Sequence, residues 1–118
     1  MTKKPAIEEL LRQYTDAARL HGEATERGDA RTANRNHDRV LRALRLLDEA
    51  SDEGRLHLVD LLGHADPHVQ TWAATHLIFL CAAKAVPVLE SVAQRPDIAG
   101  GNARMVLELW REGSLRIP

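Results

Sequence analysis

Five arginines spaced three or four residues apart form the most distinctive chemical pattern in this chain. At about 100° per residue they fall within one stripe of a helix, opposite its apolar positions. Guanidinium groups donate paired hydrogen bonds to phosphates and carboxylates. Four carboxylates on the same segment offset most of this charge, so a merely solvated face is the alternative interpretation. The stripe predicts a binding surface for an acidic partner and consists of Arg31, Arg35, Arg39, Arg42 and Arg45.

The histidines invite a metal hypothesis that their spacing does not sustain. His64 and His68 are four residues apart with Asp66 between them, which resembles a helical zinc pair. Pro67 and a predicted turn place the two histidines on different helices, however, and no HExxH motif is present. The single cysteine, Cys81, lies in an apolar run and is expected to be an inert core residue. We therefore expect no metal site and no cofactor.

An acidic elbow at residues 48–53 is the other candidate for chemistry. Paired carboxylates perform acid–base catalysis when a cleft raises a pKa. These residues lie at an exposed turn and also complement helix termini, where carboxylates are common. We therefore expect no catalytic residues and no enzyme activity.

The last predicted helix carries two apolar residues outside its inner face. Met105 and Leu109 point away from the coherent inner face, which consists of Ala103, Val106, Leu107 and Trp110. Exposed apolar residues at the end of a helical array are typical of an interface. The tail at 114–118 could cover them instead. Both interpretations stay open at this point.

Helical periodicity and turn residues divide the chain into about six helices. We predict that the first helix ends at Gly28 and that Asp29 caps the second, which runs to about Ala50. Ser51 is expected to cap a third helix that ends near Gly63. Asp66-Pro67 predicts the start of a fourth helix, whose apolar side consists of Val69, Ala73, Leu77 and Leu80. A fifth helix is predicted at 84–94, with Pro87 in its first turn. A loop at 96–101 then leads to a sixth helix at 102–112, which Gly113 closes. No segment predicts a strand.

The helices are expected to form three antiparallel pairs at 5–50, 51–82 and 84–113. The pattern of Leu58-Val59-Asp60 returns in Val88-Leu89-Glu90, a period typical of solenoid repeats. The segment from Leu61 to Val69, followed by Ala73 and Leu77, resembles the HEAT-repeat pattern, in which an Asp-Pro turn joins two helices. This resemblance implies an all-α fold, a short HEAT-like α-solenoid.

The wider layout is similar to a small bacterial family with HEAT-like repeats, domain of unknown function 2019. The shared features are the long first pair, the Asp-Pro repeat, Val88-Leu89-Glu90, and Leu109-Trp110-Arg111 with Gly113 nearby. The resemblance implies a fold and a bacterial source. It implies no activity.

Composition limits the remaining choices. The 118 residues suit one domain at 1–118, and the 44% hydrophobic and 28% charged content is typical of a folded protein. A net charge of −1 argues against a nucleic-acid binder that uses its whole surface. Glu8 and Glu9 interrupt the amino terminus before any apolar stretch, so we expect no secretory signal. We expect no membrane span, and hence a cytoplasmic location.

These observations predict a non-enzymatic protein–protein interaction module in a bacterial cytoplasm. Its partner, an unidentified protein, is expected to contact the arginine stripe or the apolar edge at Met105 and Leu109. The alternative is an electrostatic contact with nucleic acid through the same arginines, which we consider less favoured because no aromatic residues interleave with them. A homo-oligomer stays open.

Overall fold

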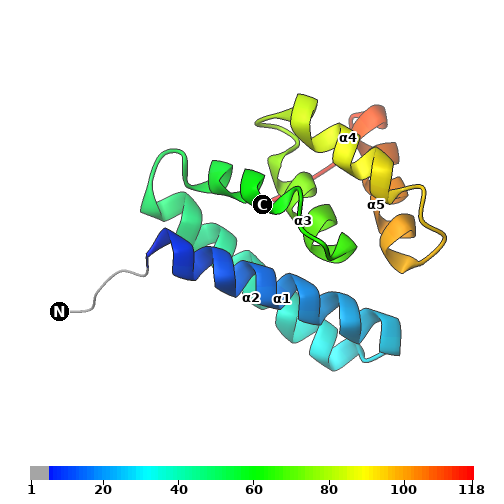
Figure 1. Cartoon of the computed structure of the whole chain (residues 1–118), viewed down its shortest axis with the longest axis horizontal. Helices are drawn as coiled ribbons and strands as arrows, with labels where there is room; N and C mark the ends of the chain where they lie inside the picture. Colours follow the sequence, from blue (N-terminus) through cyan, green and yellow to red (C-terminus); the bar gives the residue numbers. More distant parts are fainter. Residues whose placement is uncertain (1–5) are drawn as a thin grey trace. The chain divides into compact units, whose positions relative to one another are not determined.

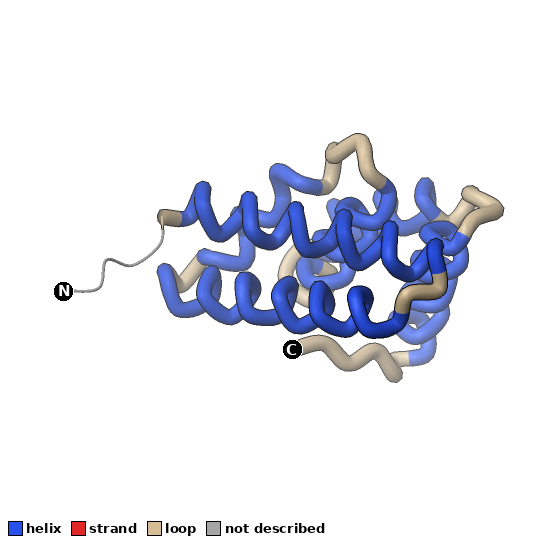
Figure 2. Tube along the Cα trace, turned by 90° about the horizontal axis from the view of Figure 1, so that it is seen from below, coloured by secondary structure: helices blue, strands red, loops and turns tan. Residues whose placement is uncertain are grey.

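The computed structural model describes residues 6–118, in which all regular structure is helical (Figure 2). Residues 1–5, where the expected first pair begins and where a secretory signal was considered, lie outside the described residues. The prediction of an all-α chain without strands is confirmed over the described range. The helices are α1 (Ile7–Arg27), α2 (Ala30–Ala50), the 3-10 helix η1 (Gly54–Leu61), α3 (Pro67–Leu77), α4 (Ala82–Val92) and α5 (Ile98–Glu112).

The chain divides into two compact units, Met1–His57 and Leu58–Pro118. In the first unit α1 and α2 lie side by side (Figures 1 and 2). Gly28 ends α1 at a φ of 73°, a left-handed conformation that only glycine adopts without strain. The Asp29 side chain then accepts a hydrogen bond from the backbone N–H of Thr32 and starts α2. Both boundaries were predicted from the sequence. The predicted apolar face of α2 is buried at Val40, Ala43, Leu44 and Leu47.

The prediction of a third α-helix capped by Ser51 is wrong. The chain instead forms η1, which begins only at Gly54 and has the tighter 3-10 hydrogen-bond pattern. The reason is close packing on the end of α2: a Cβ at Gly54 would lie 1.6 Å from the Leu47 carbonyl oxygen. Arg55 reinforces this contact by donating from Nε and Nη2 to the two carboxylate oxygens of Asp48, at 3.1 and 2.7 Å.

Helix α3 begins as predicted and ends earlier than predicted. The Asp66 carboxylate accepts hydrogen bonds from the backbone N–H groups of His68 and Val69, at 2.7 and 3.4 Å. Val69, Ala73 and Leu77 are buried. The predicted apolar side does not continue to Leu80, because the N–H groups of Leu80 and Cys81 both bond to the Leu77 carbonyl and turn the chain. Leu80 is 57% exposed as a result.

Cys81 and the helix after it also depart from prediction. Cys81 is half-buried and is the N-cap residue of α4, rather than a core residue within a helix. Because α4 begins at Ala82, Pro87 lies inside the helix rather than in its first turn. Proline has no N–H, so the Ala83 carbonyl loses its usual helical partner. Both residues are exposed, so water can satisfy that carbonyl.

The predicted loop at 96–101 is helical from Ile98 onward. Asp97 caps α5 by accepting a hydrogen bond from the Gly100 N–H at 3.1 Å. Gly100 is present because a Cβ there would lie 1.9 Å from the Arg95 carbonyl oxygen. Gly100 thus permits close packing within a helix, and the glycine pair does not mark a loop. Helix α5 ends as predicted at Gly113, which has a φ of 74°.

The second unit is built from three mutually packed helices. Each of α3, α4 and α5 contacts the other two, and the buried side chains include Val69, Leu77, Leu89, Ala103 and Leu107. No helix within residues 6–118 has the length and apolar character that crossing a bilayer requires.

Candidate functional site

The five arginines predicted as a stripe are all exposed along α2. The helix that carries them is held by its Asp29 cap at one end and by the Arg55–Asp48 contact at the other. From Arg31 to Arg45 the helix rises about 21 Å. We call this set, Arg31, Arg35, Arg39, Arg42 and Arg45, the arginine face.

The arginine face is electrostatically unsatisfied. Among the ion pairs formed within residues 6–118, none involves a member of the face. Arg39 donates to the Asn36 side-chain oxygen at 2.7 Å, which orients its guanidinium without neutralising it. An exposed cation that pairs with an acidic group gains a modest Coulomb energy and pays side-chain entropy, so each such contact contributes about 1 kcal/mol at most.

Two carboxylates interrupt the arginine face. By helical spacing, Asp38 and Glu49 fall within the same stripe, and both are exposed. The Asp38 side chain is 84% exposed and lies 3.7 Å from His37 Nδ1. The face therefore presents an array of mixed sign with an excess of positive charge.

The acidic elbow has one structural member. Asp48 holds Arg55, whereas Glu49, Asp52 and Glu53 are exposed. Arg55 also acts on Tyr14, the chain's only tyrosine. Burial raises the pKa of Tyr14 well above its ordinary value, and the nearby Arg55 charge offsets part of that rise. Asp48 and Arg55 thus serve the packing of the first unit.

The histidines take structural positions. His64 Nδ1 accepts a hydrogen bond from the backbone N–H of Asp66 at 3.0 Å, so it helps form the turn before α3. His68 and His76 are buried on α3, and the His76 ring lies 5.5 Å from the Trp72 ring. Within the described part of the chain, no three His, Cys, Asp or Glu side chains gather as a metal site would require.

The two apolar candidates on α5 differ in exposure. Met105 is 54% exposed, whereas Leu109 is half-buried. The tail turns back after Gly113, where the N–H groups of Ser114 and Leu115 both bond to the Leu109 carbonyl. Leu115 is buried. The structure therefore separates the pair: the returning tail meets the backbone of Leu109, and Met105 stays open to solvent.

Met105 lies in a groove between α4 and α5, with a volume of about 760 Å³. Such a volume is within the range of small-molecule sites. The α4 side carries Glu90, Ala93 and Gln94. Two small residues, Ala93 and Gly101, are among those that line the groove.

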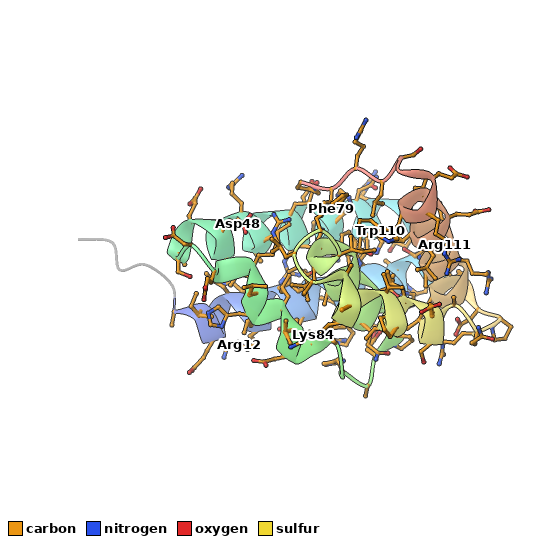
Figure 3. All side chains as sticks on the ribbon, turned by 90° about the horizontal axis from the view of Figure 1, so that it is seen from above. Arg12, Asp48, Phe79, Lys84, Trp110 and Arg111 are labelled. Atoms are coloured by element: carbon orange, nitrogen blue, oxygen red, sulfur yellow. The ribbon has the colours of Figure 1, made fainter. Side chains whose placement is uncertain are left out.

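Charged residues of α5 line the other wall of the groove. Arg104 Nη1 donates to the backbone carbonyls of Ala93 and Arg95, at 2.6 and 2.9 Å. Arg111, labelled in Figure 3, pairs with Glu90 across the groove at 3.5 Å. Glu108 lies between these two arginines in the sequence and forms no ion pair within residues 6–118. Sequence reasoning missed this wall, although the recurrence of charged residues at 104, 108 and 111 marks one face of α5.

A second missed feature is an aromatic pair between the turn after α3 and helix α5. Phe79 lies in this turn and is 56% exposed. Its ring stands edge-on to Trp110, with centroids 5.1 Å apart (Figure 3). Trp110 is half-buried. Edge-on aromatic pairs of this geometry are stabilising, so Trp110 has a packing role here.

Comparisons with known proteins give information on the fold and not on the chemistry of the site. No protein-family model matches the chain, and no curated protein matches it significantly. It is similar to a solved structure, the crystal structure of the protein RPA1889 from Rhodopseudomonas palustris CGA009, with 18% sequence identity and a TM-score of 0.87. The similarity covers 96% of this chain and 94% of that chain. At this identity the likeness concerns the fold alone.

Proposed function

We propose that this chain is a non-enzymatic protein-interaction module of a bacterial cytoplasm and that it binds an acidic protein through the arginine face. The observation that carries the proposal is the row of five exposed guanidinium groups on α2, without an ion pair among the described residues. Arginine binds carboxylates in a bidentate geometry that lysine does not provide. Complementary charge of this kind speeds association and selects the partner.

The mixed sign of the face favours a protein over a nucleic acid. A phosphate backbone presents only negative charge, so Asp38 and Glu49 would repel it at two positions of the face. A protein surface can place a lysine or arginine opposite each of these carboxylates. Electrostatic contact with nucleic acid through the same arginines is the second candidate, and it predicts an affinity that falls steeply with salt.

The finer architecture belongs to the same proposal. We take the chain to be a short HEAT-like solenoid of three antiparallel helix pairs, related to the bacterial family domain of unknown function 2019. Support comes from the all-helical structure and from the Asp66-Pro67 start of α3 with Val69 and Ala73 buried behind it. In such an array, second helices of successive pairs form a common surface on which a partner binds. On this interpretation α2 contributes the first part of that surface.

The test is charge reversal of Arg35, Arg39 and Arg42 together to Glu. Each exposed charge contact contributes about 1 kcal/mol at most, so reversal of three should weaken binding by about 100-fold. Binding is measured by tagged pull-down from source-cell lysate with and without nuclease, and then by titration with the recovered partner. The matched control reverses Lys84 and Arg116, two exposed cations outside the face without an ion pair among the described residues, and is compared with the double reversal of Arg35 and Arg39. The two variants change net charge equally, and the control should retain the partner.

The outcomes separate the candidates. A protein that survives nuclease and is lost only with the face variant supports the proposal. Recovery of nucleic acid, or of proteins lost with nuclease, would support the second candidate instead. Binding that the face variant leaves unchanged would exclude both. Because the three arginines are exposed and without ion pairs among the described residues, the variant should melt at the same temperature as the parent.

A further inference from the structure

The groove between α4 and α5 holds an arginine that is already fixed in place. Arg104 Nη1 donates to the carbonyl oxygens of Ala93 and Arg95, at 2.6 and 2.9 Å. These two bonds use both hydrogens of that nitrogen. The carbonyls lie just after the last turn of α4, where a cation is electrostatically favoured. The guanidinium therefore does not lose further freedom when it meets a ligand.

The opposite edge of the same guanidinium is open. Within residues 6–118, Nε and Nη2 of Arg104 form no hydrogen bond with protein. Nη2 lies 3.7 Å from the position that a Cβ on Gly101 would take, which places it over the small residue that lines the groove. An Nε–Nη2 edge is one of the two forks with which arginine binds a carboxylate. The groove thus contains a preorganised carboxylate-binding group.

A free carboxylate lies one helical turn further along α5. Glu108 is exposed and forms no ion pair with any described residue. It follows Arg104 by four residues, a spacing at which opposite charges often pair directly, yet Arg104 is held away from it by the two backbone carbonyls. Four residues of helix rise about 6 Å, so a small molecule can reach both groups.

The remaining lining selects the kind of molecule. The groove is lined by two cations, Arg104 and Arg111, and by two anions, Glu90 and Glu108, so its formal charges balance. The two glutamates would repel a dianion. Leu107 lines the groove together with Ala93, and Met105 is 54% exposed beside them. Methionine adapts to apolar groups of many shapes. The matching ligand carries a carboxylate, an ammonium group and an apolar body.

We propose that the α4–α5 groove binds a zwitterion with an apolar side chain, the chemistry of a free apolar amino acid or of a short peptide. Arg104 binds the carboxylate through Nε and Nη2, Glu108 binds the ammonium group, and Met105 covers the side chain. This site lies on other helices than the arginine face, and it stands or falls independently of the proposed protein partner.

The experiment is an NMR titration of the full chain, following the backbone amides of Ala93, Gly101 and Glu108. The probes are leucine, N-acetylleucine, which lacks the ammonium group, leucine amide, which lacks the carboxylate, and leucyl-leucine. Leucine should shift these amides with a Kd of about 1 mM, as expected for one open charged site. Each single-charge analogue should bind about fivefold more weakly. Leucyl-leucine that binds more tightly than leucine would assign the ligand to peptides, and the reverse order would assign it to free amino acids.

Two conservative variants test the assigned roles. Glu108→Gln should weaken leucine about fivefold and leave N-acetylleucine unchanged, because only leucine offers an ammonium group. Arg104→Lys keeps the charge but loses the fork, and it should weaken both about tenfold. A thermal melt of each variant confirms that the fold is retained. Equal binding of all four probes, an equal effect of Glu108→Gln on leucine and N-acetylleucine, or no shift of the groove amides would each overturn the proposal.

Discussion

Single residues in this chain carry roles that their types alone do not reveal, and glycine is the clearest case. Gly100 and Gly101 are neighbours in α5, but only Gly100 is sterically required. A Cβ at Gly100 would lie 1.9 Å from a backbone oxygen of Arg95, whereas one at Gly101 would meet nothing closer than 3.7 Å. The two positions therefore offer a matched pair for testing close packing.

Gly100→Ala should destabilise the chain, and Gly101→Ala should not. The first substitution forces the backbone of α5 away from Arg95 at a cost of about 2 kcal/mol. The second replaces glycine within a helix and should stabilise by up to about 1 kcal/mol. The free energy of unfolding in urea measures both effects. Equal effects of the two alanines would contradict the assigned role of Gly100.

At the scale of the element, helix starts depend on aspartate caps. Asp29, Asp66 and Asp97 each accept backbone N–H groups at the beginning of a helix. Hydrogen bonds from Arg95 and from the Gly100 N–H lower the pKa of Asp97 below its ordinary value. Hydrogen bonding to Thr32 does the same for Asp29. In acid these two carboxylates bind fewer protons in the folded chain than in the unfolded chain, so a fall in pH favours unfolding.

The Asp97 cap should make α5 sensitive to acid. Because the pKa of Asp97 is lowered in the folded chain, the contribution of its charge to stability is fully present above the ordinary carboxyl range, near pH 4. That contribution is lost as pH falls through the pKa of the folded chain. Asp97→Asn retains an oxygen to cap the helix but cannot titrate. The melting temperature of the parent should therefore fall more steeply below about pH 4 than that of the variant. Parallel pH profiles would show that the Asp97 charge does not contribute.

At the scale of the whole molecule, one buried hydroxyl reports on folding. Tyr14 is completely buried, and it is the chain's only tyrosine. Its pKa is raised by burial, with Arg55 opposing part of the effect. Above about pH 10 the unfolded chain ionises this group while the folded chain keeps its proton. The contribution of Tyr14 to stability should therefore be constant below that pH and fall as pH rises further.

Alkaline titration checks this expectation without interference from another tyrosine. Tyrosinate absorbance should appear in the same transition in which the helical circular dichroism is lost. Tyr14→Phe should weaken the alkaline loss of stability, because phenylalanine has no proton to release. Tyrosinate that forms near pH 10 in a chain with full helical signal would show that Tyr14 is accessible.

The sequence by itself determined the helical class, the ends of α1 and α5 at Gly28 and Gly113, and the starts of α2 and α3. It also located the exposed arginines of α2. These features follow from interactions within three or four residues, which a local pattern contains. They required no knowledge of distant neighbours.

Only the tertiary structure decided the remaining features. Gly54 and Gly100 depend on backbone atoms that a neighbouring segment brings close. The groove is lined by residues of α4, of the turn after it and of α5, and Arg104 connects α5 to that turn through the Ala93 carbonyl. Contacts of this kind join residues that are separated along the chain, so no local pattern specifies them.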